Sequence, residues 1–173
     1  NQVRLLRASY HHELFRFYGA LVTGDKELDP LLYDEIKRES LETTVRWIAN
    51  EFNELAEPGV LPDKYDAAAY GRATRGAALG YLARTLLYAA SPLHNASGVT
   101  WREAADAAYD MIEYADNGDF YRLYEDPTTP EKRYTRLFNT RANGEVIMGF
   151  LRASANDLYG MMPAFDPWNV NQE

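Results

Sequence analysis

The sequence predicts a mainly α-helical fold of antiparallel helix pairs, with long loops between them and a short β segment near the C-terminus. Three observations support this class. Apolar residues recur at three- and four-residue steps through four stretches before Gly118, which is the period of an amphipathic helix. Capping residues precede these stretches, and Gly or Pro follows them. Alternation of apolar and polar residues, as in a strand, is confined to the last third of the chain.

The first helix is expected over residues 3–18, and Gly19 ends its pattern. Its apolar positions share one face, which the spacing predicts to pack on a partner: Val3, Leu6, Tyr10, Leu14, Phe17 and Tyr18. The second helix is expected over residues 41–55. Ser40 is its expected N-cap and Pro58-Gly59 its terminator.

The third helix is expected to begin after Thr74 and to end at Ser91-Pro92. Small residues along it are predicted to let another helix approach closely: Gly76, Ala77, Gly80 and Ala83. The fourth helix begins with the capping box of Thr100 and Glu103, and Gly118 ends it. Together the four helices predict one core, which contains Leu6, Leu14, Val45, Ile48, Phe52, Leu79, Leu82, Leu86 and Leu87.

The pattern changes after Gly118. A short helix is expected over residues 131–138, and residues 145–151 are expected to form a strand after the Asn143-Gly144 turn. We therefore divide the chain into a helical scaffold, residues 1–152, and an irregular, aromatic-containing tail, residues 153–173. The first residue is not Met and already lies in helical register, so the chain is expected to be a partial segment of a longer one.

Composition excludes several classes of function. The chain has 173 residues, of which 46% are hydrophobic, so a packed core is expected. Its net charge is −8 without a basic cluster, which argues against a nucleic-acid partner. It contains no cysteine, and hence no disulfide, thiolate nucleophile or Cys-ligated metal. No apolar run approaches the roughly 20 residues that cross a bilayer, and no signal peptide is recognisable.

The motifs of common catalytic sites are missing from the sequence. His11 and His12 are adjacent, so they point about 100° apart on a helix and cannot share a tetrahedral metal; a packing or surface role is expected for them. There is no Gly-x-Ser-x-Gly elbow and no phosphate-binding glycine loop. Carboxylates are numerous, but their spacing does not place two of them across a cleft. We expect no catalytic residue, no metal site and no cofactor.

Aromatic residues carry the main functional signal, because 13 Tyr, 7 Phe and 3 Trp stand in the chain. Tyrosine offers an apolar face and a hydroxyl, which suits the partly solvated surfaces on which sugar rings bind. Long loops are also often functional, and three are candidates: residues 19–39, 56–73 and 91–99. Aromatics in the tail have no helical or strand period to bury them. The expected ligand-binding residues are therefore Trp168, Tyr159 and Phe165 for stacking, with Asn169 and Arg152 for hydrogen bonds.

Four stretches together resemble the SusD/RagB family of Bacteroidota outer-membrane lipoproteins. Residues 4–19 are similar to that family's "ea-r-fl-RA-yyyfel-r-yG" helix. Residues 71–95, which read GRATRGAALGYLARTLLYAASPLHN, are similar to "GRaTkGAAla-kARvlLYaaSPlfN". Residues 101–105 continue as the next family helix does, and residues 143–147 resemble the "N-E-I-f" strand. The resemblance covers about residues 1–150, and the tail matches no family motif.

This resemblance implies a tetratricopeptide-like scaffold in a cell-surface protein of the outer membrane, lipid-anchored in the full-length parent. It implies non-catalytic binding of oligo- or polysaccharides and their delivery to a SusC-like TonB-dependent transporter. The membrane would be contacted only through a lipid anchor that this chain does not contain. Two other interpretations stay open from the residues themselves. One is a helical-repeat adaptor that binds a peptide or protein partner, and the other is a fragment of an α-helical glycosidase.

Overall fold

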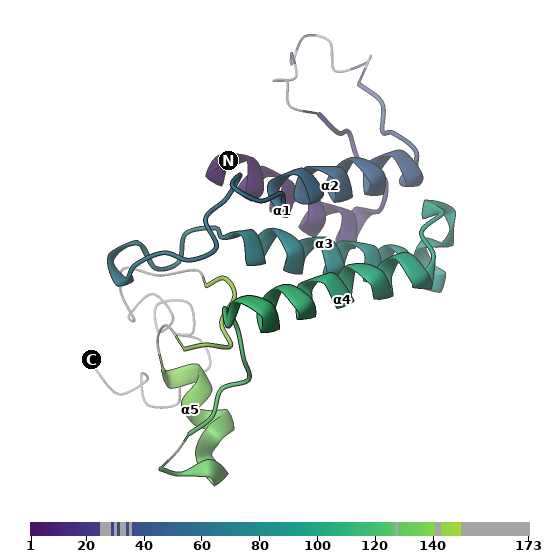
Figure 1. Cartoon of the computed structure of the whole chain (residues 1–173). Helices are drawn as coiled ribbons and strands as arrows, with labels where there is room; N and C mark the ends of the chain where they lie inside the picture. Colours follow the sequence, from purple (N-terminus) through teal and green to yellow (C-terminus); the bar gives the residue numbers. More distant parts are fainter. Residues whose placement is uncertain are drawn as a thin grey trace, which may run out of the picture.

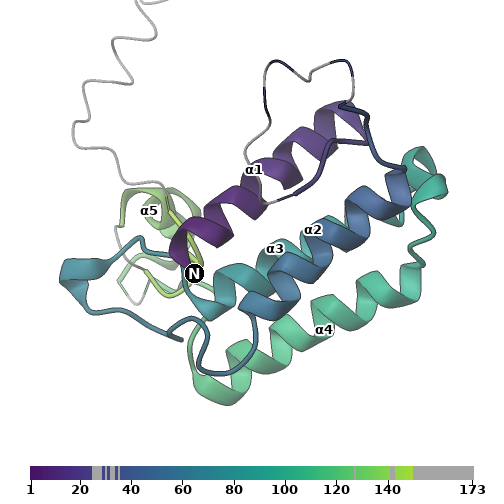
Figure 2. The same ribbon diagram turned by 90° about the horizontal axis from the view of Figure 1, so that it is seen from above.

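A computed structural model of the chain describes residues 1–24, 29, 31, 34, 36–126, 128–140 and 143–149. Its body consists of four long helices: α1 (Gln2–Tyr18), α2 (Leu41–Leu55), α3 (Arg75–Ala89) and α4 (Trp101–Gly118). They lie side by side and run alternately in opposite directions (Figures 1 and 2). The predicted class, mainly α-helical with antiparallel helix pairs, is confirmed.

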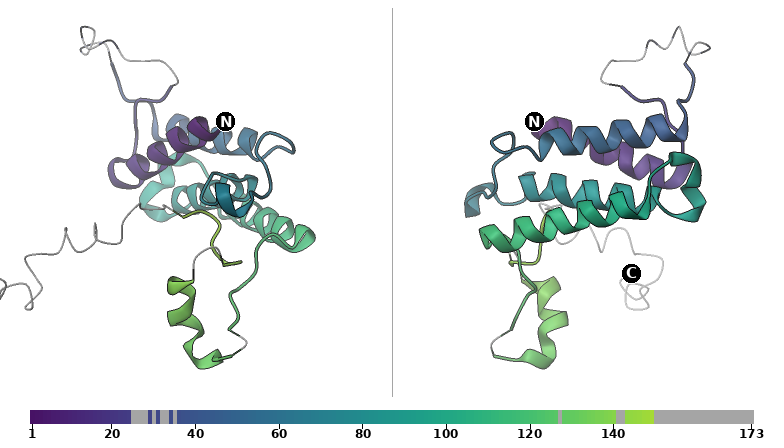
Figure 3. Two further views of the ribbon diagram at one scale, coloured as in Figure 1. Left: turned by 90° about the vertical axis from the view of Figure 1, so that its left-hand side faces the viewer. Right: turned by 45° about the vertical axis from the view of Figure 1, so that its right-hand side comes forward.

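Shorter elements connect and extend this body. The turn-like helices η2 (Ala67–Ala69) and η3 (Pro92–Ser97) lie before and after α3, and η4 (Pro130–Lys132) leads into α5 (Arg133–Asn139). The α5 region projects away from the four long helices (Figure 3). Within the described ranges, no helix has both the length and the apolar character needed to span a membrane.

The expected caps are present at the starts of three helices. The Ser40 hydroxyl accepts a hydrogen bond from the Thr43 amide at 3.0 Å. The Thr74 hydroxyl likewise accepts from the Ala77 amide at 3.2 Å. At α4, the Thr100 side chain accepts from the Glu103 amide while the Glu103 carboxylate accepts from the Thr100 amide, so the capping box is complete. The helix starts could therefore be located from single residues.

Helix α3 lies between α2 and α4 and contacts α1 as well (Figure 2). Six of the nine predicted core residues are buried, as expected: Val45, Ile48, Phe52, Leu79, Leu82 and Leu86. Leu6 is only half-buried. The prediction is wrong for Leu14 and Leu87, which are 45% and 53% exposed.

The predicted buried face of α1 is wrong. Val3 is 79% exposed and Phe17 75%, and Tyr10 and Tyr18 are also exposed. The helix instead buries its opposite face, formed by Leu5, Ala8, Ser9, His12 and Phe15. Ala8 and Ser9 are small, so neighbouring residues can pack closely against this face. Ser9 donates to the Leu6 carbonyl, and His12 bonds to Thr85. We call the outward row of Val3, Leu6, Tyr10, Leu14 and Phe17 the α1 stripe.

His12 joins α1 to α3 inside the core. Its Nδ1 lies 2.9 Å from the Thr85 hydroxyl oxygen, and that hydroxyl donates to the Tyr81 carbonyl at 2.7 Å. Because the Thr85 proton is already used, His12 must donate from Nδ1, which fixes its tautomer. Its Nε2 is buried and has no hydrogen-bond partner among the described residues. The expected packing role is thus confirmed for His12.

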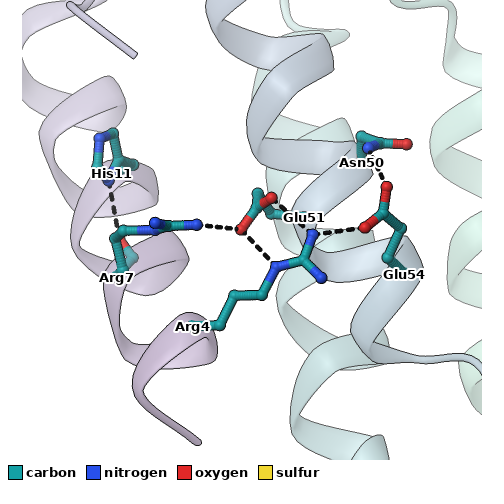
Figure 4. Close-up of polar contacts among 6 residues, drawn as sticks. All are labelled: Arg4, Arg7, His11, Asn50, Glu51 and Glu54. Carbon is teal, nitrogen blue, oxygen red and sulfur yellow. Dashed lines mark hydrogen bonds and ion pairs between the residues drawn. The ribbon is translucent and has the colours of Figure 1, made fainter. Parts of the chain in front are cut away.

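A network of charges joins α1 to α2 (Figure 4). The Arg4 guanidinium binds both oxygens of Glu51, at 2.9 and 2.7 Å, and Arg7 binds the same carboxylate at 2.9 Å. Arg4 also pairs with Glu54. Glu51 is only 8% exposed, and the hydrogen bond from Arg4 holds the pKa of its carboxyl below the ordinary value. Two cations therefore meet two anions, and the network acts as a clamp.

The last third of the chain is only partly described. The short helix expected over residues 131–138 is present as η4 and α5. Residues 145–149 form no strand, and Phe150 and Leu151, which complete the expected strand, lie outside the described residues. The tail, residues 153–173, also lies outside them, so the division of the chain at residue 152 stays a prediction.

The burial pattern of α3 gives a first testable prediction. Leu82 is 9% exposed and Leu87 is 53% exposed on the same helix. Leu82→Ala should lower the free energy of unfolding by about 2–5 kcal/mol, because it removes buried methyl groups and leaves a cavity. The matched change Leu87→Ala should alter it by no more than about 0.5 kcal/mol. Urea denaturation of both variants measures this, and equal losses would contradict the packing of α3.

His12 predicts a pH dependence of stability. Burial is the main cause that lowers its pKa from 6.5 to about 4, while nearby Arg84 and Arg16 lower it further and Glu13 opposes them. The unfolded chain therefore binds more protons than the folded chain between these values. The contribution of His12 to the free energy of unfolding should be fully present above pH 6.5. It should fall by roughly 3 kcal/mol as the pH drops to 4.

Denaturation of the wild type and of His12→Gln between pH 7 and pH 5 tests this expectation. The variant should lose most of the slope in this window. A smaller slope should remain, because burial also lowers the pKa of His94. Parallel curves for the two proteins would show that His12 takes up a proton without cost in the folded state.

Candidate functional site

A pocket of about 280 Å³ lies at the end of the helical body where α3 begins. Its walls come from the loop between α2 and α3, from residues that follow α4, and from residues 143–149. Three half-buried tyrosines, Tyr65, Tyr70 and Tyr121, line it. Polar side chains stand among them: Asp63, Lys64, Asp66, Arg72, Thr74 and Asn143. We call this site the tyrosine pocket.

The start of α1 holds the first wall in place. The Gln2 side-chain amide accepts from the Ala73 amide and donates to the Ala73 carbonyl, both at 2.8 Å. It also donates to the Tyr65 hydroxyl. The Asn1 side chain donates to the Val60 carbonyl at 2.7 Å. The loop that carries Tyr65 and Tyr70 is therefore tied at both of its ends to residues more than fifty positions earlier.

Local sequence shapes this loop between its anchors. The Asp66 carboxylate accepts from the Ala69 amide at 2.9 Å and so caps the short helix η2. Gly71 has a φ of 93°, which an L side chain rarely adopts, and this turn leads the chain back to α3. Tyr70 stands between the cap and the turn. The Asp66 cap and the Gly71 turn thus shape the backbone on either side of Tyr70.

Tyr121 forms the second wall by lying on Gly76. A Cβ atom at Gly76 would stand 2.8 Å from the Tyr121 hydroxyl oxygen and nearer still to the ring. The Tyr121 and Thr74 hydroxyls lie 2.9 Å apart. The expectation that Gly76 admits another helix is therefore wrong, because the glycine admits an aromatic ring. Gly80 has only Ile147 near its Cβ position, at 3.9 Å, so it serves no close helix contact either.

The third wall is an Asx turn. The side-chain oxygen Oδ1 of Asn143 accepts from the backbone amides of Glu145 and Val146 at 3.0 and 3.2 Å. The side-chain nitrogen Nδ2 of Asn143 donates to the Leu137 and Thr140 carbonyls. The backbone of Arg122 donates to the Gly144 carbonyl at 3.0 Å, which joins this wall to the segment of Tyr121. Asn143 is fully used by these bonds, so its role in the pocket is structural.

The electrostatics of the pocket favour neutral hydroxyl groups beside balanced charges. Burial raises the pKa of Tyr121, so its phenol stays protonated at neutral pH. Asp63 accepts from the Tyr114 hydroxyl at 2.9 Å and lies 3.9 Å from Arg75. Lys64 and Arg72 are exposed at the rim. This arrangement can stack a ring and exchange hydrogen bonds with it.

The residues expected to bind ligand lie outside the described residues: Trp168, Tyr159, Phe165, Asn169 and Arg152. Their assignment stays a prediction. Of the three candidate loops, residues 56–73 supply two tyrosines of the pocket. Residues 91–99 are occupied by η3, where the Ser97 hydroxyl donates to the Ala89 carbonyl at 2.8 Å and closes α3. The position of Tyr65 and Tyr70 in a long loop was the feature of the sequence that could indicate a functional role for them. No feature of the sequence indicated such a role for Tyr121.

Comparison with solved structures finds related folds, among them two proteins from Bacteroides fragilis. A SusD-like protein from Bacteroides fragilis matches with a TM-score of 0.68 and 26% identity, over 89% of this chain and 27% of that one. The chain has a SusD-like fold. A SusD-like carbohydrate-binding protein from the same organism matches with a TM-score of 0.54 and 24% identity, over 76% of this chain and 25% of that one.

The SusD-like assignment made from the sequence is thereby confirmed. The chain spans about a quarter of the length of each of these relatives. Comparison with family models and with curated proteins finds no match. The SusD-like likeness therefore rests on the fold together with the identity to the first structure.

The contact between Gly76 and Tyr121 gives a testable prediction. Gly76→Ala should destabilise the SusD-like chain by about 1–3 kcal/mol, because the new methyl group must displace the Tyr121 ring. The control Gly80→Ala should stabilise it by about 0.5–1 kcal/mol, since alanine is the better helix former and its Cβ meets only ordinary contact. Denaturant melts measure both changes. Two stabilised variants would show that Tyr121 does not lie on α3.

Proposed function

We propose that the chain is part of a SusD-like protein that binds glycans without catalysis and delivers them to a SusC-like TonB-dependent transporter at the outer-membrane surface. One observation carries the proposal, namely the likeness to a SusD-like protein over 89% of the chain at 26% identity. The second relative is described as carbohydrate-binding, which supports a glycan as the ligand. Delivery to the transporter and a lipid anchor in the parent follow from the family resemblance alone.

The tyrosine pocket supports sugar binding on chemical grounds. Its rings offer apolar faces for the C–H patches of a sugar, and its hydroxyl and charged groups can bond to sugar hydroxyls. Tyr121 is held by Thr74 and Gly76 before any ligand arrives. A ring that is fixed in advance loses little conformational entropy on binding. The pocket therefore suits reversible capture of a sugar residue.

The tail aromatics belong to the same proposal. Trp168 would provide a second stacking face, with Tyr159 or Phe165 beside it and Asn169 or Arg152 as hydrogen-bond donors. One stacked ring with two or three hydrogen bonds contributes only a few kcal/mol, since each bond is worth about 0.5–1.5 kcal/mol. The affinity of each site should be millimolar to tens of micromolar. Long polysaccharides would be retained through several such contacts.

A helical-repeat adaptor for a peptide or protein is the second candidate function. The α1 stripe favours it, because Val3, Tyr10 and Phe17 present apolar side chains at helical spacing to solvent. Such a row suits a helix or loop of another polypeptide. The two candidates use different residues, so ligand-induced NMR shifts would separate them. Glycan binding should perturb the residues of the tyrosine pocket, and peptide binding those of the α1 stripe.

Binding of the chain to an immobilised glycan panel tests the main proposal. Tyr121→Ala should weaken binding about tenfold, because it removes one stacking face worth roughly 1–1.5 kcal/mol. Trp168→Ala tests the tail in the same way. Tyr109→Ala is a matched control, since Tyr109 is 59% exposed on α4 and outside the tyrosine pocket. Equal binding by Tyr121→Ala and Tyr109→Ala would remove the pocket from the glycan site.

A further inference from the structure

We propose that the tyrosine pocket continues into a second, acidic pocket, and that the two form one cleft for a neutral oligosaccharide of several residues. Glycans that carry uronic acid or sulfate groups would be disfavoured. This inference rests on the proposed function and names the class of glycan. It follows from the adjacency of the two pockets, from the rings between them, and from the charges that line both.

The second pocket lies beside the first, where α2 ends, α3 begins and α4 ends. Its volume is about 550 Å³, and Phe120 lines both pockets. The hydrogen bond from the Tyr114 hydroxyl to Asp63, 2.9 Å long, joins a residue of the second pocket to a residue of the first. Small-molecule sites measure about 300–1,000 Å³. The second pocket falls within this range, and the tyrosine pocket lies at its lower end.

Aromatic rings connect the two pockets. The Tyr114 ring lies 4.8 Å from the Phe120 ring and 6.5 Å from the Tyr121 ring, measured between centroids. The Arg75 guanidinium lies 5.0 Å from the centre of the Tyr114 ring. These rings therefore place aromatic side chains along the boundary between the two pockets. A sugar chain needs such rings, since each successive residue presents its own C–H face.

Polar groups in the second pocket are available to a ligand. Asp110, Asn53 and Asn117 line it, and none of their side chains hydrogen-bonds to another described residue. Arg75 is different, because its Nε donates to the Ala56 carbonyl at 2.6 Å. The pocket thus combines a carboxylate acceptor with two amides that can both donate and accept. These groups match sugar hydroxyls, which do the same.

The charges of the cleft favour a neutral ligand. In the tyrosine pocket, the charges of Asp63 and Asp66 are balanced by those of Lys64 and Arg72. In the second pocket, Glu57, Asp110 and Glu113 face only one cation, Arg75. The cleft therefore carries a net charge of −2 within a chain of net charge −8. A carboxylate or sulfate on the glycan would meet repulsion that a hydroxyl does not.

Calorimetry on the full chain tests this inference with defined probes. The neutral probes are glucan, xylan and mannan oligosaccharides of two to six residues. The anionic probes are oligogalacturonides and sulfated galactan oligosaccharides of the same lengths. We expect at least one neutral series to bind, with an affinity that rises about three- to tenfold as added residues reach the second pocket. The anionic probes should bind at least about tenfold more weakly in low salt.

Asp110→Asn is the decisive variant, and Asp106→Asn is its control. Both remove one carboxylate from α4, but Asp106 lines neither pocket and pairs with Arg102 at 2.9 Å. Asp110→Asn should raise the affinity for oligogalacturonides about three- to fivefold and leave or lower that for the neutral series. Asp106→Asn should change neither. These opposite effects on two ligand classes would not result from a general loss of folding.

Three results would count against the inference. Preference for the anionic probes, or no gain in affinity with chain length, would overturn the single neutral cleft while leaving glycan binding intact. Equal behaviour of the two Asn variants would show that the second pocket is not part of the site. If no probe binds to the wild-type chain, both this inference and the proposed function fail.

Discussion

Burial of α3 by its neighbours is the constraint on which the rest of the structure depends. Its residues contact α1, α2 and α4, so each neighbouring helix is positioned by the side chains that α3 presents to it. His12 is part of this contact, because its buried imidazole donates a hydrogen bond from Nδ1 to the Thr85 hydroxyl of α3. The Arg4 and Arg7 clamp on Glu51 then fixes α1 against α2 as well. A shift of α3 would disturb all of these contacts together.

The candidate glycan site stands at the first turn of this same helix. Thr74 caps α3 and also meets the Tyr121 hydroxyl, so one side chain begins the helix and orients a wall of the site. Gly76 lies beneath the ring because no larger residue fits there. Gln2 holds the opposite wall from the start of α1. The site is therefore mounted on the rigid part of the molecule, although its tyrosines come from loops.

Features that depend on neighbouring residues in the sequence could be predicted, and features that depend on distant contacts could not. Ser40, Thr74 and the Thr100–Glu103 box located the helix starts, because capping is decided within one turn. The prediction that the α1 stripe is buried was wrong, since periodicity identifies an apolar face but does not show whether that face contacts the core or solvent. Gly76 was recognised as a position that must stay small, but its neighbour is 45 residues away in sequence. The same holds for Tyr121, whose place in a pocket depends on α3.

The projecting segment around α5 is bonded to the site at its base, because Asn143 of the tyrosine pocket donates to the Leu137 and Thr140 carbonyls. Helix α5 has seven residues, contacts η4, and is too short to be stable by itself in water. The bonds from Arg122 to Gly144 and from Tyr124 to Glu145 close the neck between this segment and the tyrosine pocket. The amide hydrogens of α5 should therefore exchange with solvent through local opening, whereas those of α3 should exchange only when the whole chain unfolds. Each such opening would release the bonds from Asn143 to α5, so the wall formed by Asn143 should be less rigid than the walls that Thr74 and Gln2 hold.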